Sequence, residues 1–398
     1  WIYRNNKTQS RNYYLRVKEK GKTPFVKSLD TQDRSEALVS GRLLYQEVKG
    51  KIARGEKSRS LITSKLIQKY LASESKKITT LPKAGILQST YDCKCQYLRT
   101  WQNFIDEKKL SNKVIEQIPV DIGKEFPYWA QNQDKKFYKG TPYSHEYINS
   151  ITAEVKLMYM KFAVKNRFIS LDHVPDFERL RVQPESGHKR DILTEEEWLK
   201  LTTYMRTNAY LKPEGSTPLE RCKRSIFREY LLVAYSTGAR PNELMTMTWG
   251  DVRMNPQDTV ENQQVMRLLK VRSENSKTGK SRTINAPVAR RLQRLQKAYE
   301  DIGMTCEPTD YLFRNPTPAR RNKNIAWGQP ALTGRLEKVL NWSGIQEELD
   351  RTGRRITLYS QRHFYVTLRL RHGMNIHLLC KNIGSSILYV EQNYSHVV

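Results

Sequence analysis

The sequence predicts an α+β protein that is mostly helical, with a small three-stranded sheet plus a helix at its N-terminus and a small antiparallel sheet in its C-terminal half. Two short β-type runs, 12–17 and 23–29, flank a Lys- and Gly-containing turn at 18–22. Apolar residues then recur at helical spacing through most of the chain. A polar stretch at 182–190 reads as a linker. The 398 residues are enough for two or three domains with their own cores.

Residues 1–59 form the first predicted domain, in which one helix packs on the sheet. Asp33 and Glu36 resemble a capping pair at the start of this helix, and Gly55 ends it. The segment carries 15 Lys and Arg against 6 Asp and Glu. This charge favours a module that contacts DNA over a purely structural capping subdomain. The apolar positions of the helix are Ala37, Gly41, Leu44, Val48 and Ile52.

Residues 60–182 form a second, helical domain with two apolar stripes that predict core positions. Cys95 belongs to the first stripe, so we expect it to be a buried small apolar residue. The opposite faces carry Lys94, Arg99, Lys156 and Lys161, which we expect to be solvated or to contact phosphates. The stripes consist of Tyr91, Cys95, Leu98, Trp101 and Ile105, and of Ile148, Ile151, Val155, Met158 and Phe162.

Residues 190–398 form the third predicted domain. Thr194 and Glu197 have the spacing of a capping box that begins a helix. A later helix stops at Gly238, and Pro241 suits the first position of the next one because it needs no amide donor there. Arg240 therefore falls at a helix N-terminus, where free N–H groups favour an anion.

Composition restricts the partners of this chain. The net charge is +28 and the isoelectric point is about 9.8, which favours binding to nucleic acid. No apolar run approaches the roughly 18 residues of a spanning helix, so we expect no membrane. The five cysteines and seven histidines show no zinc or disulfide spacing, and we expect no metal and no cofactor. Trp1 is not a usual start, so we expect that preceding residues are missing.

Four residues of the C-terminal segment suggest a reactive site. Arg240 begins a helix, Lys277 lies in the turn of a predicted hairpin, and Arg362 and Tyr394 lie in or beside helical stretches near the chain end. Taken singly, each residue has a structural explanation: Arg240 could pair with Glu243, Lys277 could be a solvated turn lysine, and Tyr394 could be a packing residue. The occurrence of all four in one segment favours a functional site. The two strands of the hairpin cover 265–271 and 281–287.

Together these side chains can attack a phosphodiester without a metal. Two guanidinium groups, on Arg240 and Arg362, can hold the non-bridging oxygens of one phosphate. The ammonium of Lys277, or less favourably Lys280, can protonate a departing alkoxide. The Tyr394 phenol is the nucleophile, and because a phenol has a pKa of about 10 it needs cationic neighbours or a proton acceptor.

The local sequences around these residues resemble the tyrosine recombinase (phage integrase) family over 190–398. The matching motifs are Ser-Thr-Gly-Ala-Arg-Pro-Asn-Glu-Leu at Arg240, Ser-Lys-Thr-Gly-Lys at Lys277, Leu-Tyr-Ser-Gln-Arg-His at Arg362, and the segment from Ile383 to Tyr394. The resemblance implies a catalytic domain at 190–398. It also implies, with weaker motifs, an arm-type DNA-binding domain at 1–59 and a SAM-like core-binding domain at 60–182.

Two positions depart from the family pattern. Tyr359 stands where the family usually has His, and Ser385 stands where it has His or Trp. Tyr359 can hydrogen-bond a phosphate but is a poor base near pH 7, and Ser385 can donate one hydrogen bond. His363 could take over proton transfer, but the family position favours a structural role for it. We assign His396 to the C-terminal cap.

The resemblance implies a site-specific recombinase that joins DNA through a 3′-phosphotyrosine link and mobilises a phage or another mobile element. Its partners would be double-stranded DNA with core-type and arm-type sites, three further copies in a homotetramer on two duplexes, and accessory DNA-bending or directionality factors. Its location would be the cytoplasm, in the bacterial nucleoid or a phage-infected cell. The alternatives are a type IB topoisomerase and a catalytically impaired DNA-binding protein. Only four residues follow Tyr394, so a C-terminal helix lent to a neighbour is either missing or replaced by other contacts.

Overall fold

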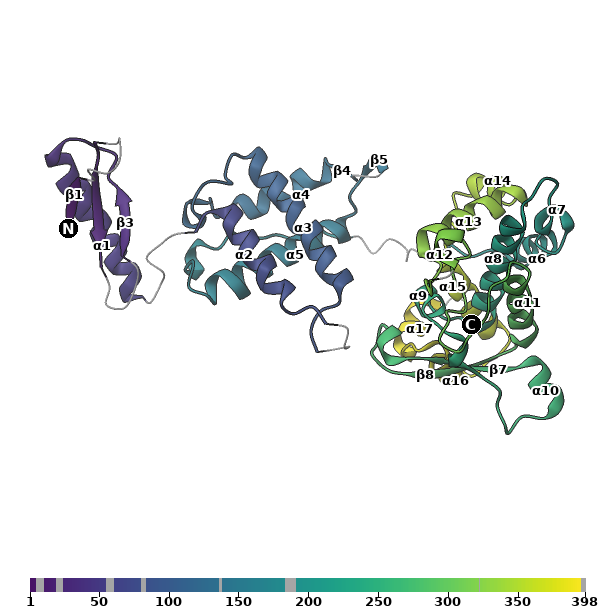
Figure 1. Ribbon diagram of the computed structural model, residues 1–398. Coiled ribbons are helices and arrows are strands. Elements are labelled where there is room, and N and C mark those ends of the chain that lie inside the picture. Colours follow the sequence, from purple (N-terminus) through teal and green to yellow (C-terminus); the bar gives the residue numbers. More distant parts are fainter. Residues whose placement is uncertain are drawn as a thin grey trace. The chain divides into compact units, whose positions relative to one another are not determined.

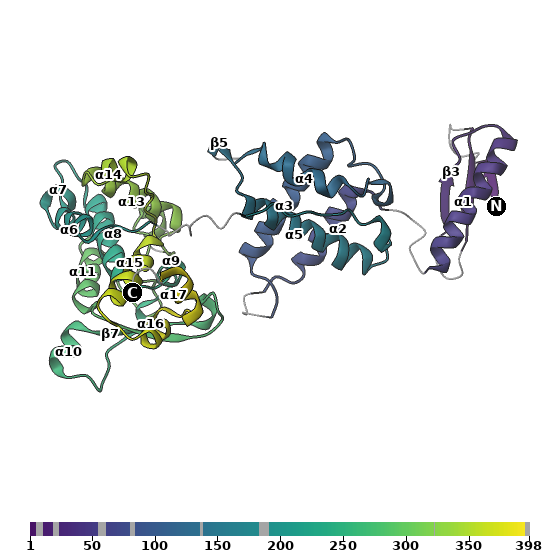
Figure 2. The same ribbon diagram turned by 180° about the vertical axis from the view of Figure 1, so that it is seen from behind.

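The computed structural model divides into two compact units, Trp1–Gln183 and Pro184–Val398 (Figures 1 and 2). It confirms the predicted mostly helical α+β class. Several predicted features lie outside the described residues, namely the turn at 19–22, Gly55, the linker at 183–190 and His396. The described ranges are 1–4, 11–18, 24–54, 61–79, 84–135, 138–182, 191–321 and 323–394.

The first unit begins with an antiparallel sheet in the order β1-β2-β3. Helix α1 packs on this sheet, and Val48 of α1 forms a small core with Leu15 and Val17 of β2. The Asp33 side chain caps α1 by accepting from the backbone N–H groups of Ser35 and Glu36, as predicted, whereas the Glu36 carboxylate accepts from the Thr31 hydroxyl and not from the Asp33 backbone. The bounds are β1 (Ile2–Arg4), β2 (Tyr13–Val17), β3 (Phe25–Ser28) and α1 (Arg34–Ala53).

A helical bundle follows, and the two predicted stripes supply much of its core. Trp101 and Ile105 of the first stripe and Ile151 and Val155 of the second are fully buried. Cys95 is only half-buried, so the expectation that it is buried was wrong. The elements are α2 (Thr63–Ser75), α3 (Gln88–Glu107), α4 (Ile122–Gln131), the hairpin of β4 (Asp134–Lys135) and β5 (Tyr138–Pro142), α5 (His145–Leu157), a π-helical continuation (Met158–Val164), and 3₁₀ turns at Ile115–Gln117 and Leu171–His173.

Lys94 corrects a second expectation, because it is buried instead of being solvated or facing a phosphate. Its Nζ lies 2.6 Å from Glu154 Oε1 and 3.3 Å from Glu74 Oε2. The Tyr70 hydroxyl donates to the same Glu154 oxygen at 2.7 Å. Helices distant in sequence thus bring together a charge network that compensates the desolvation of the lysine. Arg99, Lys156 and Lys161 are exposed, as expected.

The second unit contains a three-stranded antiparallel sheet in the order β6-β7-β8, and its helix α8 packs against both α11 and α15. Figures 1 and 2 show α16 beside the sheet, and α16 contacts β8. Its elements are α6 (Glu195–Tyr204), α7 (Asn208–Leu211), α8 (Pro218–Thr237), α9 (Pro241–Met245), β6 (Val252–Arg253), α10 (Val260–Val265), β7 (Arg267–Val271), β8 (Arg282–Ala286), α11 (Ala289–Glu300), α12 (Pro318–Arg321), α13 (Gln329–Trp342), α14 (Gln346–Arg351), α15 (Ser360–Arg371), α16 (Ile376–Ile383), α17 (Ile387–Tyr394), and 3₁₀ turns at Trp249–Asp251 and Ser273–Asn275.

The helix boundaries that matter for the site follow from local sequence signals. Thr194 and Glu197 form the predicted capping box of α6. Helix α8 ends at Gly238, which adopts a left-handed conformation with φ of 61° that favours glycine. Arg240 is the N-cap of α9 and Pro241 its first residue, as predicted. Across the described ranges, no helix is long and apolar enough to cross a bilayer. Within the same ranges, no three His, Cys, Asp or Glu side chains gather as metal ligands would.

Candidate active site

Arg240 is held in place at the start of α9. Its backbone N–H donates to Glu243 Oε2 at 2.8 Å, and its Nη1 donates to Glu243 Oε1 at 3.0 Å. Its Nη2 donates to the Gly384 carbonyl at 3.1 Å. Its Nε is buried and has no hydrogen-bond partner among the described residues. A buried donor without a partner costs about 1–3 kcal/mol, so an anion that accepted this N–H would be stabilised here.

Glu243 accepts both of these hydrogen bonds from Arg240, and it is only 2% exposed. Arg282 of β8 donates two parallel hydrogen bonds to this carboxylate, from Nη1 to Oε1 at 2.9 Å and from Nη2 to Oε2 at 2.6 Å. Burial by itself would raise the pKa of Glu243, but hydrogen bonds and charge from Arg282 and Arg240 outweigh it and lower the pKa. Glu243 is therefore a buried carboxylate that fixes two arginines.

Arg362 of α15 is the second predicted phosphate-binding arginine, and it is 2% exposed. Its Nη1 donates to the carbonyls of Gly238 and Ile383, both at 2.8 Å. Burial lowers its pKa, and the nearby charge of Arg240 lowers it further. In the described part of the chain, the Nε and Nη2 of Arg362 have no protein partner. Two guanidiniums are thus fixed near each other, which favours a negatively charged ligand.

A cavity of about 630 Å³ opens beside Arg240. Its wall includes four predicted site residues, Arg240, Lys277, Tyr359 and Ser385. Lys277 lies in the loop between β7 and β8 and is exposed. The lining holds five basic side chains and, among the described residues, no Asp or Glu. The basic residues are Arg240, Lys277, Lys280, Arg282 and Lys381.

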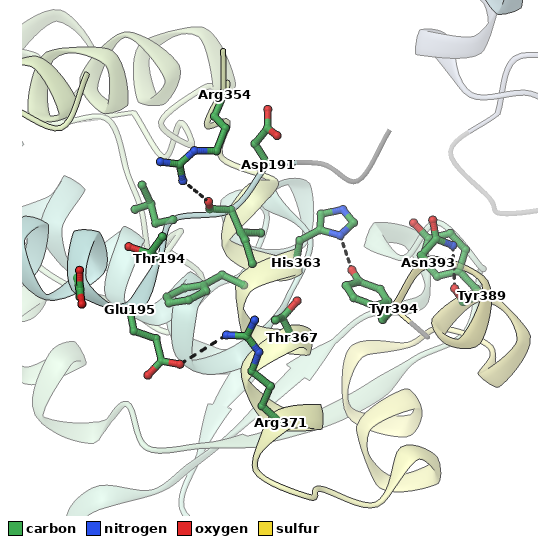
Figure 3. Close-up of a pocket in the computed structure, with 14 residues that line it drawn as sticks. Asp191, Thr194, Glu195, Arg354, His363, Thr367, Arg371, Tyr389, Asn393 and Tyr394 are labelled. Atoms are coloured by element: carbon green, nitrogen blue, oxygen red, sulfur yellow. Dashed lines mark hydrogen bonds and ion pairs between the residues drawn. The ribbon is translucent and has the colours of Figure 1, made fainter. Parts of the chain in front are cut away.

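Tyr394 lies at the end of α17 and faces a different cavity, of about 920 Å³ (Figure 3). It is 4% exposed, and its hydroxyl shares a hydrogen bond with Nδ1 of His363. The two rings stack with centroids 5.4 Å apart. Tyr389 lines both cavities. Of the six predicted site residues, four therefore share one cavity, Arg362 is buried next to Arg240, and Tyr394 opens into the second cavity.

His363 is the residue that the sequence interpretation placed outside the site. It follows Arg362 on α15, contacts Tyr394 as described, and lies with its ring centroid 5.3 Å from that of Tyr359. The only sequence signal for it was its position directly after Arg362 in the motif. An unprotonated imidazole nitrogen can accept a phenolic proton, so His363 is a candidate base beside Tyr394.

Comparison with known proteins places these observations in a family. The phage integrase family model matches residues 192–398. The chain is similar to the XerH site-specific recombinase bound to its difH substrate, with 15% identity, a TM-score of 0.55, and coverage of 89% of this chain and 91% of that one. It is also similar to a lambda integrase tetramer bound to a Holliday junction, with 16% identity, a TM-score of 0.54, and coverage of 97% and 95%.

A third similar structure is the Tn1549 transposon integrase in complex with transposon right end DNA, with 15% identity, a TM-score of 0.51, and coverage of 84% of this chain and 95% of that one. No curated protein sequence matches the chain. At such low identities the three structures establish the shared fold.

Proposed function

Because the chain belongs to the phage integrase family, we propose that it is a site-specific DNA recombinase that cleaves and rejoins strands through a 3′-phosphotyrosine intermediate. The observation that carries this proposal is the cavity whose wall has five basic side chains, with the buried Arg362 guanidinium beside Arg240. Such a concentration of positive charge suits a phosphodiester and the charge that develops on it during attack.

In the proposed reaction the phosphate is held by Arg240 and Arg362. The Tyr394 oxygen forms a bond to phosphorus while the bond from phosphorus to the 5′ oxygen breaks. The phenolic proton passes to His363, and Lys277 gives a proton to the 5′ oxygen, which leaves as a hydroxyl group. The ester bond to Tyr394 retains the energy of the cleaved link. A 5′ hydroxyl from a partner strand can then attack it and reseal the DNA.

Tyr359 and Ser385 have supporting roles in this proposal. Both line the cationic cavity, and each carries one hydroxyl that can donate a hydrogen bond to a non-bridging phosphate oxygen. Neither residue needs to act as a base when His363 does so.

The position of Tyr394 implies a movement during the reaction. Tyr394 lines the second cavity, whereas Arg240 and Lys277 line the first. In the proposed reaction Tyr394 therefore moves towards the first cavity while its hydroxyl stays within reach of His363, whose ring centroid lies 5.3 Å from that of Tyr359 in the wall of that cavity. Gly384, with φ of 63°, ends α16 just before α17. We infer that DNA binding favours the shifted position.

Double-stranded DNA is the proposed partner of all three segments. The N-terminal segment 1–59 would bind arm-type sites and the segment 60–182 core-type sites, and the net charge of +28 supports extensive phosphate contact. The lambda integrase tetramer on a Holliday junction supports an assembly of four copies on two duplexes. The proposal also includes accessory factors that bend DNA or set the direction of the reaction. It further includes a mobile-element origin and a location with the cell's DNA.

A strand-exchange assay tests this function. Two duplexes of different length, each with the attachment sequence that flanks the gene, are incubated with the protein in excess EDTA. Recombinant products of new length are expected, since the site uses cations of the protein instead of a metal. Relaxation of supercoiled plasmid without exchange would instead identify a topoisomerase. Specific DNA binding without any strand cleavage would identify an impaired DNA-binding protein.

A further inference from the structure

Three consecutive main-chain carbonyls at the C-terminus of α16 each accept a hydrogen bond from a different arginine. The Asn382 carbonyl accepts from Arg282 Nε at 2.9 Å. The Ile383 carbonyl accepts from Arg362, and the Gly384 carbonyl accepts from Arg240, as described above. The last carbonyls of a helix lack intrahelical donors and carry partial negative charge, so they are suited to guanidinium groups.

Arg282 differs from the other two arginines in its remaining bonds. Its two terminal nitrogens both donate to the buried carboxylate of Glu243, and its Nε donates to Asn382. Its side chain is 9% exposed. Three of its five N–H donors are thus used within the protein, including both terminal nitrogens of the fork that could otherwise hold a phosphate. Arg282 is therefore placed to position other groups instead of binding the phosphate itself.

The element that Arg282 fixes is the loop that carries Lys277. Arg282 is the first residue of β8, and Lys277 lies five positions earlier, in the loop between β7 and β8. Arg282 also lies directly against the backbone of Gly384, where an added Cβ would come within 2.8 Å of its Nη1. The Arg282 side chain thus connects the β7–β8 loop, which carries Lys277, to α9 through Glu243 and to the end of α16 through the Asn382 carbonyl.

We propose that Arg282 is a positioning residue that fixes the β7–β8 loop, and with it the Lys277 ammonium, relative to the phosphate held by Arg240 and Arg362. This inference rests on the proposed strand-cleavage function. Lysine at position 282 cannot reproduce the arrangement, because an ammonium lacks the planar fork that makes two parallel bonds to a carboxylate while donating a third to a carbonyl.

The leaving group gives a test that separates this role from a general structural one. With an ordinary DNA strand the 5′ oxygen needs a proton, whereas a 5′-bridging phosphorothiolate strand releases sulfur. A thiol has a pKa near 8.5, so the sulfur leaves as a thiolate without protonation. A defect confined to the position of Lys277 should therefore be relieved by sulfur, and a defect in phosphate binding should not.

We would measure single-turnover cleavage by Arg282→Lys and Arg282→Gln in the full chain on both kinds of DNA. Each variant is expected to cleave the oxygen substrate about 10²-fold more slowly than wild type and the sulfur substrate within about threefold of it. Lys277→Ala should behave in the same way, and Arg240→Ala should be slow on both substrates. Arg282→Lys keeps a cation beside Glu243 and so carries the test if Arg282→Gln fails to fold.

Arg294→Gln is the matched control. Arg294 of α11 makes two parallel bonds to another buried carboxylate, Glu229, at 2.9 Å each, and it lines neither cavity. The Arg294→Gln variant should cleave both substrates as fast as wild type. Equal losses on both substrates for the two Arg282 variants, or normal cleavage of the oxygen substrate, would overturn the proposal. Wild-type protein that cleaves neither substrate would instead overturn the proposed function.

Discussion

At the scale of single residues, the hydrogen bond between Tyr394 and His363 determines the state of the proposed nucleophile. It gives the phenol a nitrogen partner, and it keeps the hydroxyl in the cavity that lacks Arg240 and Lys277. His363 thus holds the hydroxyl of the nucleophile, and in the proposed reaction it also receives the phenolic proton. A phenol attacks phosphorus efficiently only when a base removes that proton.

Replacement of His363 tests this role. His363→Ala should slow cleavage about 10²-fold near pH 7, because no base then accepts the phenolic proton. The deficit should shrink as pH rises towards 10, where a phenol ionises without help. Single-turnover cleavage from pH 6 to 10 measures both effects.

The control is His372→Ala, which removes a histidine just beyond the other end of α15 that bonds to the Leu368 carbonyl. It should keep the wild-type pH profile. A His363→Ala profile parallel to that of wild type would show that this histidine has no part in proton transfer.

Motif residues could be identified from sequence, but their partners could not. The types and order of Arg240, Lys277, Arg362 and Tyr394 are visible in short segments. The direction of the Tyr394 hydroxyl depends on how α17 packs against α15 and α16, where the ring of Tyr394 contacts a cluster that includes Tyr365 and Leu379. No local pattern encodes such a contact.

At the scale of elements, the end of α16 and the start of α9 form one assembly around Glu243. The end of α8 and the start of α9 were predictable because Gly238 and Pro241 are local signals, and the start of α6 was predictable from the Thr194–Glu197 pair. Lys94 shows where local signals fail, since its acidic partners come from helices α2 and α5. Charges paired across distant elements look solvated when only the sequence is considered.

The pH dependence of stability should report the Glu243 assembly. The pKa of Glu243 in the folded protein lies below its ordinary value of 4.5, so its stabilisation is fully present above pH 4.5 and is lost as pH falls through the lower folded value. Glu243→Gln should reduce the free energy of unfolding by about 3 kcal/mol at pH 7. The difference from wild type should diminish below pH 4.5.

Denaturant unfolding at pH 7, 5, 4 and 3 measures that difference. Glu347→Gln, which changes an exposed glutamate on α14, is the control and should alter stability little at any of these values. A Glu243→Gln deficit that stays constant down to pH 3 would show that the buried carboxylate is not the source of the effect.

At the scale of the whole molecule, positive charge is distributed over both units. Residues 1–59 alone carry 15 Lys and Arg against 6 Asp and Glu, in a chain with a net charge of +28. Each phosphate neutralised by such a residue releases counterions, so DNA affinity should depend steeply on salt. The composition predicted this property directly, whereas the assignment of separate DNA sites to each segment stays a prediction.

Removal of residues 1–59 tests the role of the N-terminal segment. The truncated protein should bind its full attachment DNA with a smaller salt dependence, and each lost phosphate contact should lower the log–log slope by about 0.9. Binding titrations between 50 and 300 mM salt give the slopes. A shortened DNA without the flanking arm sequence serves as the control, on which both proteins should show similar slopes. An unchanged slope on the full DNA would remove the arm-binding role.

The central claim is that Tyr394 becomes covalently joined to DNA. It is tested most directly with a duplex nicked near the cleavage site, which loses its short 5′-hydroxyl fragment and traps the intermediate. Wild-type protein should form a stable protein–DNA adduct, and digestion followed by mass spectrometry should place a 3′-phosphonucleotide on Tyr394. Tyr394→Phe should form no adduct while still binding the duplex. An adduct formed by Tyr394→Phe, or none formed by wild type, would contradict the account.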